Sequence, residues 1–389
     1  MIKILHLTHA FFPDRSGTAE RIFYSQPKLG FKHFIIKPGI EDSHYLHEGY
    51  SVYTLKLSSA KKSRLNTKQN AKIIACFAHK LIKKHEIKIL YGHNPLLFSL
   101  ATLLVVKKNP SISLIYEPHN LLYSHFLKRI NEKHSFIPKG LLRLYHSFLV
   151  KTERKLMIKS DIIISQTEAL KKEVVKLYSV NQKKVIVGYN GIPEIKINLK
   201  KESILKKHQL PNDKFIIYGG DLSDNNGLIY IIKLIETQPN YSFIIAGKGK
   251  YTKTLEEYSK KFKNLFFFGV LQKSEYLELL SVSDTLLILR KSDLTNNVYL
   301  PLKILDALLL NKKVITTNLS IMREISNIYS LIFFTTLDND KIGDKIKEVM
   351  KIDNRLFISQ EFKVKNSPFI WNKTRENIAN AIQKIILKI

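Results

Sequence analysis

Short apolar segments alternate with longer segments of helical periodicity along nearly the whole chain, and this alternation limits the possible folds most. In the first half, Ile2–Thr8, Ile87–Tyr91 and Ile112–Glu117 are typical of buried strands separated by helix-length stretches. The pattern restarts at Phe215–Tyr218 and continues through Thr285–Leu289. Strands that alternate with helices favour parallel sheets covered by helices, so the sequence predicts an α/β protein with two such sheets.

The best domain boundary is the turn-rich segment 188–193, which contains two glycines and a proline. We therefore expect a first domain at residues 1–188 and a second at 189–370. The last segment, 371–389, has the periodicity of a helix. A chain of 389 residues is long enough to form two hydrophobic cores.

The composition is that of a globular protein from a reducing compartment. Hydrophobic residues make up 44% and charged residues 25% of the chain, which are ordinary globular values. The single cysteine, Cys76, excludes an internal disulfide framework. No signal peptide is visible, and the longest apolar run, 95–106, is too short to span a bilayer. We therefore expect a cytoplasmic protein.

The chain is strongly basic, and the excess is concentrated in its first half. Lys and Arg total 63 against 33 Asp and Glu, a net charge of +30, of which residues 1–190 carry +20. This surplus predicts an anionic lipid surface or a phosphorylated substrate as partner; the alternative is a general bias toward Lys, Ile and Asn. Residues 121–159 mix basic and apolar side chains, as does a helix on an anionic membrane or one packed on its own domain. No nucleic-acid-binding motif is present, so nucleic acid is not an expected partner.

The segment 297–317 is the clearest candidate for anion binding. Pro301 suits the first turn of a helix, and leucines repeat at helical spacing after it. Lys303 and Asp306 are three residues apart, so they share one helix face near the N-terminus. A helix N-terminus beside a lysine suits an anion, and the aspartate can accept hydrogen bonds from sugar hydroxyls. The alternative is an ordinary amphipathic helix with two solvated charges.

Four further candidates stand next to expected strand ends. His119 follows the strand at Ile112–Glu117, at the edge where open α/β sheets bind ligands. Gly17 begins a helix after the first strand, where a glycine lets the backbone approach a ligand closely. Arg290 and Gly220 follow strands of the second half. An inconsequential loop histidine and a plain turn are the alternatives for His119 and Gly17.

Several segments together resemble the GT-B glycosyltransferases of family 4, over nearly the whole chain. The matching segments are Phe12–Gly17, Tyr116–Asn120, Ser160–Ser165, Tyr189–Ile192, Phe268–Leu271, Ser283–Asp284 and Pro301–Ala307. The last of these is similar to the Pro-Ser-Lys-x-x-Glu-Tyr element of a subgroup often found in O-antigen, capsule and exopolysaccharide assembly. Each match is modest, but their order and spacing together are specific.

The resemblance implies two Rossmann-like parallel-sheet domains facing a cleft, with a closing helix at 371–389 that crosses back to the first domain. It implies retaining transfer of a sugar from a nucleotide sugar, with no metal and no other cofactor. The donor would bind mainly to the C-terminal domain. A lipid-linked or glycan acceptor would rest on the basic N-terminal domain, with the protein peripheral on the inner membrane face.

The resemblance also implies a role for each candidate residue. His119 would contact the donor sugar near the reacting centre, and Gly17 would let the backbone approach the diphosphate. The other donor-binding positions are Leu302 and Lys303 for the diphosphate, Asp306 for the ribose, Leu271 for the base, and Gly220.

The chain departs from the family's pattern at three positions. Many members have Gly-Arg-Leu-x-x-x-Lys-Gly after the first strand of the second domain, whereas Asp221 and Asn226 occupy the positions of its two cations here. Val298 replaces the first carboxylate of the family's Glu-x7-Glu pair. We expect Arg290 and Lys303 to supply the missing positive charge. The competing interpretation is a degenerate GT-B protein that binds nucleotide or sugar without turnover, and a GT-B epimerase is a further option.

Overall fold

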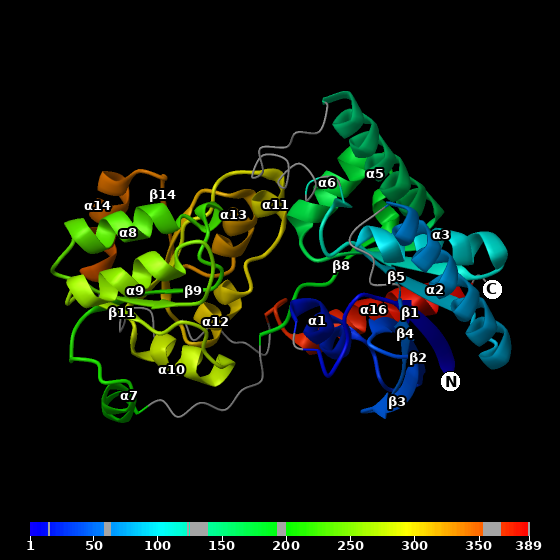
Figure 1. Ribbon diagram of the computed structural model, residues 1–389, viewed down its shortest axis with the longest axis horizontal. Helices are drawn as coiled ribbons and strands as arrows, with labels where there is room; N and C mark the ends of the chain where they lie inside the picture. The colour runs from blue at the N-terminus through cyan, green and yellow to red at the C-terminus, as the bar shows by residue number, and fades with distance from the viewer. Residues whose placement is uncertain are drawn as a thin grey trace. The chain divides into compact units, whose positions relative to one another are not determined.

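The computed structural model describes residues 1–14, 16–57, 64–122, 124, 139–192, 200–352 and 367–387 of the chain. The chain divides into two compact units (Figure 1). Unit 1 comprises Met1–Gly191 and Trp371–Ile389, and unit 2 comprises Ile192–Ile370. Each unit is a sheet with helices packed on it, so the predicted pair of α/β layers is confirmed.

Unit 1 is built on an eight-stranded sheet. Its strands are β1 (Ile2–Leu7), β2 (Phe31–Gly39), β3 (Ser43–His47), β4 (Tyr50–Lys56), β5 (Ile89–His93), β6 (Ser113–Glu117), β7 (Ile162–Ser165) and β8 (Val185–Val187). Its helices are α1 (Gly17–Ser25), α2 (Arg64–His85), α3 (Leu96–Lys108), α5 (Lys139–Lys159), α6 (Glu168–Tyr178) and α16 (Trp371–Ile386), with a short 3-10 turn at Gln182–Lys184.

The strand order in unit 1 is β3-β4-β2-β1-β5-β6-β7-β8. Consecutive βα units extend the sheet from β1 toward β2 on one side and from β5 toward β8 on the other. The reversal between β1 and β5 is the position where open α/β sheets bind ligands, outside the carboxyl ends of the strands.

The edge strand β3 was not predicted, and it makes the sheet mixed rather than wholly parallel. It pairs antiparallel with β4, through a two-residue turn in which Glu48 and Gly49 have φ angles of 44° and 88°. Two successive residues with positive φ are typical of the tight hairpin turns that match strand twist. The strand itself is mostly exposed and short, so its sequence carries no run of buried residues to reveal it.

Unit 2 is built on a six-stranded, wholly parallel sheet in the order β11-β10-β9-β12-β13-β14. Its strands are β9 (Phe215–Gly219), β10 (Ser242–Ala246), β11 (Leu265–Phe267), β12 (Thr285–Ile288), β13 (Lys313–Thr317) and β14 (Ile332–Thr335). Its helices are α7 (Lys201–Lys207), α8 (Leu228–Thr237), α9 (Thr252–Lys261), α10 (Lys273–Val282), α11 (Leu294–Val298), α12 (Lys303–Leu309), α13 (Ser320–Ser326) and α14 (Asn339–Met350), with a 3-10 turn at Asp224–Asn226. The order reverses between β9 and β12, so these two strand ends mark the expected ligand position in this unit.

The helix α16 packs within unit 1, although unit 2 precedes it in the sequence. In Figure 1 it is the red helix beside α1. Its residues Ile378, Ile382 and Ile385 join the cluster that covers β1, β5, β6 and β7. The single tryptophan, Trp371, is 8% exposed at the start of this helix. Its ring lies so close to Gly191 that a Cβ there would come within 2.4 Å of Trp371 Cγ.

Part of the predicted basic segment, residues 125–138, lies outside the described residues. The remaining part of the basic segment is mainly α5. This helix buries Leu149, Leu156 and Met157 on unit 1, so its apolar face packs on its own domain. Within the described part of the chain, no helix is both long and apolar enough to cross a membrane.

Candidate functional site

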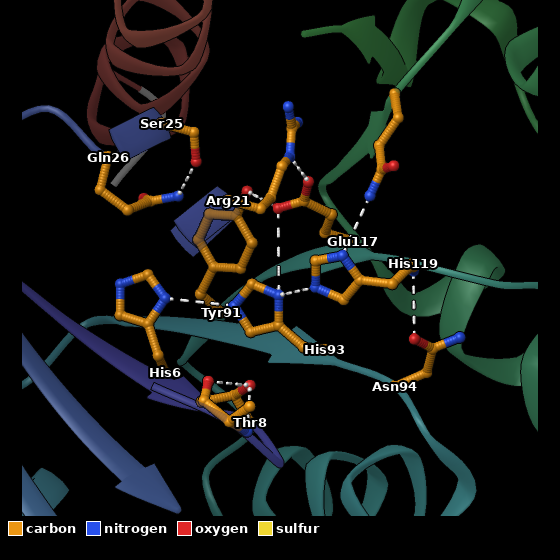
Figure 2. A network of polar contacts seen from close by, with 12 residues as sticks. His6, Thr8, Arg21, Ser25, Gln26, Tyr91, His93, Asn94, Glu117 and His119 are labelled. Atoms are coloured by element: carbon orange, nitrogen blue, oxygen red, sulfur yellow. Dashed lines mark hydrogen bonds and ion pairs between the residues drawn. The ribbon is translucent and has the colours of Figure 1, made fainter. Parts of the chain in front are cut away.

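Four histidines from neighbouring strands of unit 1 form a continuous hydrogen-bonded row, which we call the histidine array: His33, His6, His93 and His119. His33 Nδ1 lies 3.0 Å from His6 Nε2, His6 Nδ1 lies 3.3 Å from His93 Nε2, and His93 Nδ1 lies 3.0 Å from His119 Nε2. Figure 2 shows His6, His93 and His119 in this row. The strand register explains the alignment, because side chains two residues apart along a strand share one face of the sheet.

Both ends of the histidine array are held by groups of known hydrogen-bonding character. His33 Nε2 lies 2.7 Å from the carbonyl oxygen of Pro27. At the other end the side-chain amide of Gln166 lies 3.0 Å from His119 Nδ1. The backbone amide of His119 donates to Asn94 Oδ1 at 3.1 Å. His119 is therefore fixed both through its ring and through its main chain.

Burial keeps the array uncharged. Burial lowers the pKa of His33 to about 4, and it lowers the pKa of His119 to about 4 against the opposing field of Glu117. Burial, and then the neighbouring rings, also hold the pKa values of His6 and His93 well below 6.5. All four imidazoles are neutral at pH 7, because a buried cation would lose its hydration.

A buried ion pair lies beside the array. Arg21 Nε, from α1, lies 2.7 Å from Glu117 Oε1, and both side chains are essentially inaccessible. The Tyr91 hydroxyl donates to Glu117 Oε2 at 2.7 Å, as Figure 2 shows from close by. Burial alone would raise the pKa of Glu117, but Arg21, His119 and these hydrogen bonds hold it below its usual value. Glu117 is therefore a carboxylate.

His93, Glu117 and His119 also place three possible metal-ligand atoms within 4.8 Å of one another. Each of these atoms already has a partner. The two histidine nitrogens face each other, and the carboxylate oxygens accept from Arg21 and Tyr91. A cation here would also meet the Arg21 charge, so the donor set fits a hydrogen-bond network better than a metal ion.

The structure places the two sequence candidates of unit 1 differently. His119 lies within the network, whereas Gly17 is the exposed first residue of α1. Ser16 caps this helix, since its hydroxyl accepts from the amide of Ala19 at 3.1 Å. The partners of His119 were not predicted, although a histidine in the interior of the apolar β1 was a usable signal.

Two cations of unit 2, Arg290 and Lys303, form what we call the cation pair. Arg290 follows β12 and Lys303 begins α12, beside the loop that follows β9. Lys303 Nζ lies 4.0 Å from the centre of the Tyr218 ring. A Cβ on Gly220 would come within 3.1 Å of Lys303 Nζ, so the glycine leaves room for the ammonium. The sequence candidates Gly220, Arg290 and Lys303 thus converge at the reversal point of the sheet.

The cation pair is rich in uncommitted donors. Among the described residues, Lys303 Nζ has no hydrogen-bond acceptor, and Arg290 donates only through Nη1, to the carbonyl of Tyr299 at 3.2 Å. Burial lowers the pKa of Lys303 to about 7, and the Arg290 charge adds to this effect against the fields of Asp221 and Asp306. Burial likewise lowers the pKa of Arg290, opposed by Asp293. An anion bound here would relieve the repulsion within the pair.

Asp306 is not a solvated charge, as the alternative of an ordinary amphipathic helix would have it. Its side chain is 3% exposed, and its Oδ1 lies 2.6 Å from Lys273 Nζ of α10. The neighbouring hydroxyl of Tyr276 is buried and has no hydrogen-bond partner among the described residues. Tyr276 packs so tightly on Gly219 that a Cβ there would come within 2.2 Å of its ring. Neither Lys273 nor Tyr276 was singled out by the sequence.

The acidic loop after β9 is better compensated than its sequence indicates. Asp224 accepts from Lys250 Nζ at 2.7 Å and from the Tyr251 hydroxyl. Asn226 donates to Asp221 Oδ2 at 3.2 Å. Hydrogen bonds from Lys250 and Tyr251 lower the pKa of Asp224. Asp224 is therefore compensated by a lysine that lies on a different loop.

The remaining two candidates lie on the surface of unit 2. Leu302 is 43% exposed and precedes α12 as its N-cap, without a side-chain capping bond. The helix begins at Lys303, so Pro301 stands before the cap rather than in the first turn. It spans seven residues, and side-chain cations rather than a long helix dipole supply the positive field. Leu271 is half-buried in the loop before α10.

Comparisons with known proteins agree with this architecture. A model of Glycosyltransferase Family 4 matches residues 22–194, and a model of Glycosyl transferases group 1 matches residues 200–361. A search of curated proteins finds no match.

Solved structures of similar fold cover nearly the whole chain. Sucrose-phosphate synthase from Thermosynechococcus elongatus aligns over 100% of both chains, with a TM-score of 0.76 and 10% identity. HepE from Anabaena, in complex with UDP, aligns over 98% of this chain and 100% of its own, with a TM-score of 0.67 and 16% identity. WaaG, a glycosyltransferase involved in lipopolysaccharide biosynthesis, aligns over 96% and 98%, with a TM-score of 0.67 and 14% identity.

Two Rossmann-like parallel-sheet units and these structural matches define a GT-B fold. Because two models of the same enzyme group match the chain in succession, the chain belongs to the GT-B glycosyltransferases of family 4. It is a retaining glycosyltransferase that transfers a sugar from a nucleotide donor.

Proposed function

We propose that this glycosyltransferase builds cell-surface glycans by moving a sugar onto a lipid-linked or glycan acceptor, and that the cation pair holds the donor diphosphate. The observation that carries the proposal is the convergence of Arg290 and Lys303 beside Gly220 with donors to spare. A leaving diphosphate needs such donors in a desolvated site, because they stabilise negative charge as the sugar departs. The structure of HepE, a similar protein, is a complex with UDP.

The other residues have supporting roles in this proposal. His119 contacts the donor sugar. Gly17, which has no side chain, lets the protein backbone approach the diphosphate closely. Asp306 binds the ribose, because its carboxylate gives up the ion pair with Lys273 and accepts hydrogen bonds from the ribose hydroxyls. Leu271 and Leu302 contact the nucleotide. The reaction proceeds without a metal ion, since two cations already face the diphosphate. Turnover that survives EDTA supports this, and loss of turnover that magnesium or manganese restores overturns it.

The acceptor side of the proposal rests on the charge of unit 1. The exposed face of α5 carries Arg143, Lys151, Arg154, Lys155 and Lys159. Its apolar face is buried, so attachment to an inner-membrane surface is electrostatic and reversible, and the enzyme is peripheral. Each basic residue near an anionic surface contributes about 1 kcal/mol, which salt screens.

Titration of the Lys303→Ala variant tests the diphosphate site. We expect nucleoside diphosphate to bind at least tenfold more weakly, about 1.4 kcal/mol, with nucleoside binding almost unchanged. The matched control is Lys233→Ala, which removes an exposed lysine of α8 paired with Glu236. Asp221→Arg is expected to bind diphosphate as well as the wild type or better. Wild-type affinity in Lys303→Ala contradicts the site, and binding without product from any donor favours the degenerate GT-B interpretation.

Vesicle sedimentation tests the membrane proposal. The full chain is expected to bind anionic vesicles at low salt and to leave them at high salt. The triple variant Lys151→Glu, Arg154→Glu, Lys155→Glu is expected to bind less than a variant with three changed lysines in unit 2. Equal binding to neutral vesicles contradicts the electrostatic mechanism.

A further inference from the structure

We propose that His93, His6, His33 and Gln166 are positioning residues that hold His119 in one neutral tautomer, with its proton on Nε2. This inference rests on the proposed function, in which His119 contacts the donor sugar. It goes beyond it because it assigns a shared role to three histidines that lie away from the donor. It also specifies which chemistry His119 cannot perform.

The direction of every hydrogen bond follows from the Pro27 end. A carbonyl oxygen only accepts, so His33 must carry its proton on Nε2, 2.7 Å from that oxygen. In a neutral ring Nδ1 is then an acceptor, and it requires the proton of His6 on Nε2. The same step repeats from His6 to His93. It repeats once more to His119, whose Nε2–H must donate to His93 Nδ1.

The Gln166 end is consistent with the same direction. If His119 carries its proton on Nε2, its Nδ1 needs a donor. The side-chain amide nitrogen of Gln166 lies 3.0 Å away and supplies that donor. The two ends lie on opposite sides of the array and are unrelated in sequence, and the amide nitrogen of Gln166 lies where the tautomer required by the Pro27 carbonyl needs a donor. This agreement favours a uniform tautomer over a mixture.

The array is unsuited to carrying protons. Proton conduction would need an acceptor at the far end, but the Pro27 carbonyl cannot take up a proton. A second proton on any ring would set two N–H groups against each other and break a hydrogen bond. The charged groups around the array are Glu117, already paired with Arg21, and Lys28, whose field adds to the effect of burial in lowering the pKa of His33; burial also lowers the pKa of the neighbouring His9. The network therefore stabilises one arrangement and stores no proton.

This arrangement limits what His119 offers to a substrate. Both ring nitrogens are committed within unit 1, so the ring contributes a fixed, neutral, polarised edge rather than a general acid or base. Charge that develops during sugar transfer must be stabilised by other groups, such as the cation pair. The precision of the ring position then depends on side chains as distant as His33.

Nitrogen-15 NMR of the histidine-labelled full chain tests this inference. Protonated and unprotonated ring nitrogens give distinct signals, so the tautomer of each ring is read directly. We expect His119 in the wild type to carry one proton, on Nε2. The variant His6→Phe does not alter a residue in contact with His119, but it removes the acceptor of the His93 Nε2–H. The direction of the hydrogen bond between His93 and His119 is then no longer fixed, so His119 should gain a population protonated on Nδ1.

Gln166→Glu replaces a donor by an acceptor and is the complementary variant. Its carboxylate should raise the proton affinity of the His119 ring about tenfold to a thousandfold, so that the ring takes up its second proton at a correspondingly higher pH than in the wild type. Gln166→Met removes the donor without adding an acceptor and should leave the tautomer on Nε2. The control His79→Phe removes a histidine of α2 that bonds Asn109 instead, and should leave the His119 signals unchanged.

The outcomes separate this inference from the proposed function. A wild-type His119 protonated on Nδ1, or on both nitrogens, overturns the inference, as do His119 signals unaffected by both His6→Phe and Gln166→Glu. If His6→Phe does not fold, Gln166→Glu alone decides. These signals need no donor or acceptor, so they remain informative even if nucleotide binding fails, and a failed tautomer test leaves the diphosphate site standing.

Discussion

The ligand edges of the two sheets are built on opposite principles. In unit 1, each ring nitrogen of the histidine array has a hydrogen-bond partner, and the nearby carboxylate is paired with an arginine. In unit 2, the cation pair and the Tyr276 hydroxyl have donors without acceptors among the described residues. The rings of the histidine array are satisfied without a ligand, although Arg21 Nη2 beside them has no partner among the described residues, and the cation pair is incomplete until an anion arrives.

The difference teaches where rigidity and affinity arise. A satisfied buried network fixes atoms in place, because moving any member leaves a polar group unpaired. In a cationic site without bound anion, the positive charges repel each other. A bound anion removes this repulsion, which makes the binding free energy more favourable. Unit 1 is therefore suited to positioning and unit 2 to gripping a charged leaving group.

The largest expected effect is acid unfolding of unit 1. Native His33 and His119, with pKa values of about 4, bind fewer protons than their unfolded forms, so their contribution to stability is complete above pH 6.5 and falls as pH drops toward 4. The lowered pKa values of His6 and His93 act in the same direction. Glu153, whose pKa burial raises to about 8, opposes this by one proton in the same window. Each net proton taken up on unfolding contributes about 1.4 kcal/mol per pH unit at the steepest.

Urea unfolding between pH 7 and 5, followed by the fluorescence of Trp371, checks this dependence within unit 1. His33→Phe removes one buried neutral histidine and is expected to reduce the slope by about one proton. A stability that stays constant between pH 6.5 and 5 would show that the array is protonated in the folded protein.

The next largest effect is expected from Arg21→Met. This change leaves the Glu117 carboxylate buried without its cation and should cost about 3–5 kcal/mol. The matched control is Lys28→Met, since Lys28 and Glu48 form an exposed pair at 3.5 Å that is worth about 0–1 kcal/mol. Urea unfolding by tryptophan fluorescence measures both. Equal losses in the two variants would contradict a satisfied, rigid edge in unit 1.

Diphosphate affinity should respond to pH through Lys303, by about tenfold. With a pKa of about 7 in the free protein, Lys303 is charged below neutrality and loses its charge above it. Affinity is therefore expected to fall as pH rises from 7 to 8, about 1.4 kcal/mol per unit of pKa. Lys303→Arg keeps its charge and should flatten the dependence. Calorimetric titration of both proteins with nucleoside diphosphate at several pH values measures the dependence. If the affinity of both proteins changes equally with pH, the dependence belongs to another group.

A comparable or smaller effect is expected from a pair of tyrosines. Tyr91→Phe removes a hydroxyl bonded to Glu117 and should cost unit 1 about 1–3 kcal/mol. Tyr276→Phe removes a hydroxyl without a partner among the described residues, so unit 2 should be unchanged or gain about 1 kcal/mol. Hydrogen exchange of β6 and β9 reports the two changes separately. A loss in unit 2 as large as that in unit 1 would remove the contrast.

The sequence predicted the alternation of strands and helices because that pattern is local. It also singled out His119, Arg290 and Lys303, each of which stands next to a strand end or a helix start. The edge strand β3 was not predicted, because an exposed strand lacks the run of apolar residues that indicates a buried strand.

The partners of these residues were not predictable in the same way. His6, His93 and His119 meet only because β1, β5 and β6 are neighbours, and strand order is not written in local periodicity. The pairs Asp306 with Lys273 and Asp224 with Lys250 also join separate elements. The net charge of a short segment therefore predicts the local electrostatics poorly when the partners that neutralise it come from another element.

The position of α16 has a consequence for how the protein is made. Ile378, Ile382 and Ile385 complete the core over β1 and β5, but a ribosome adds them only after all of unit 2. Domains commonly fold in the order in which they emerge. Here the part synthesised first keeps an apolar face uncovered while the second unit is made and folds. A nascent chain arrested before residue 371 therefore displays that face, and chaperones that recognise exposed apolar surface have their target on the older half of the chain.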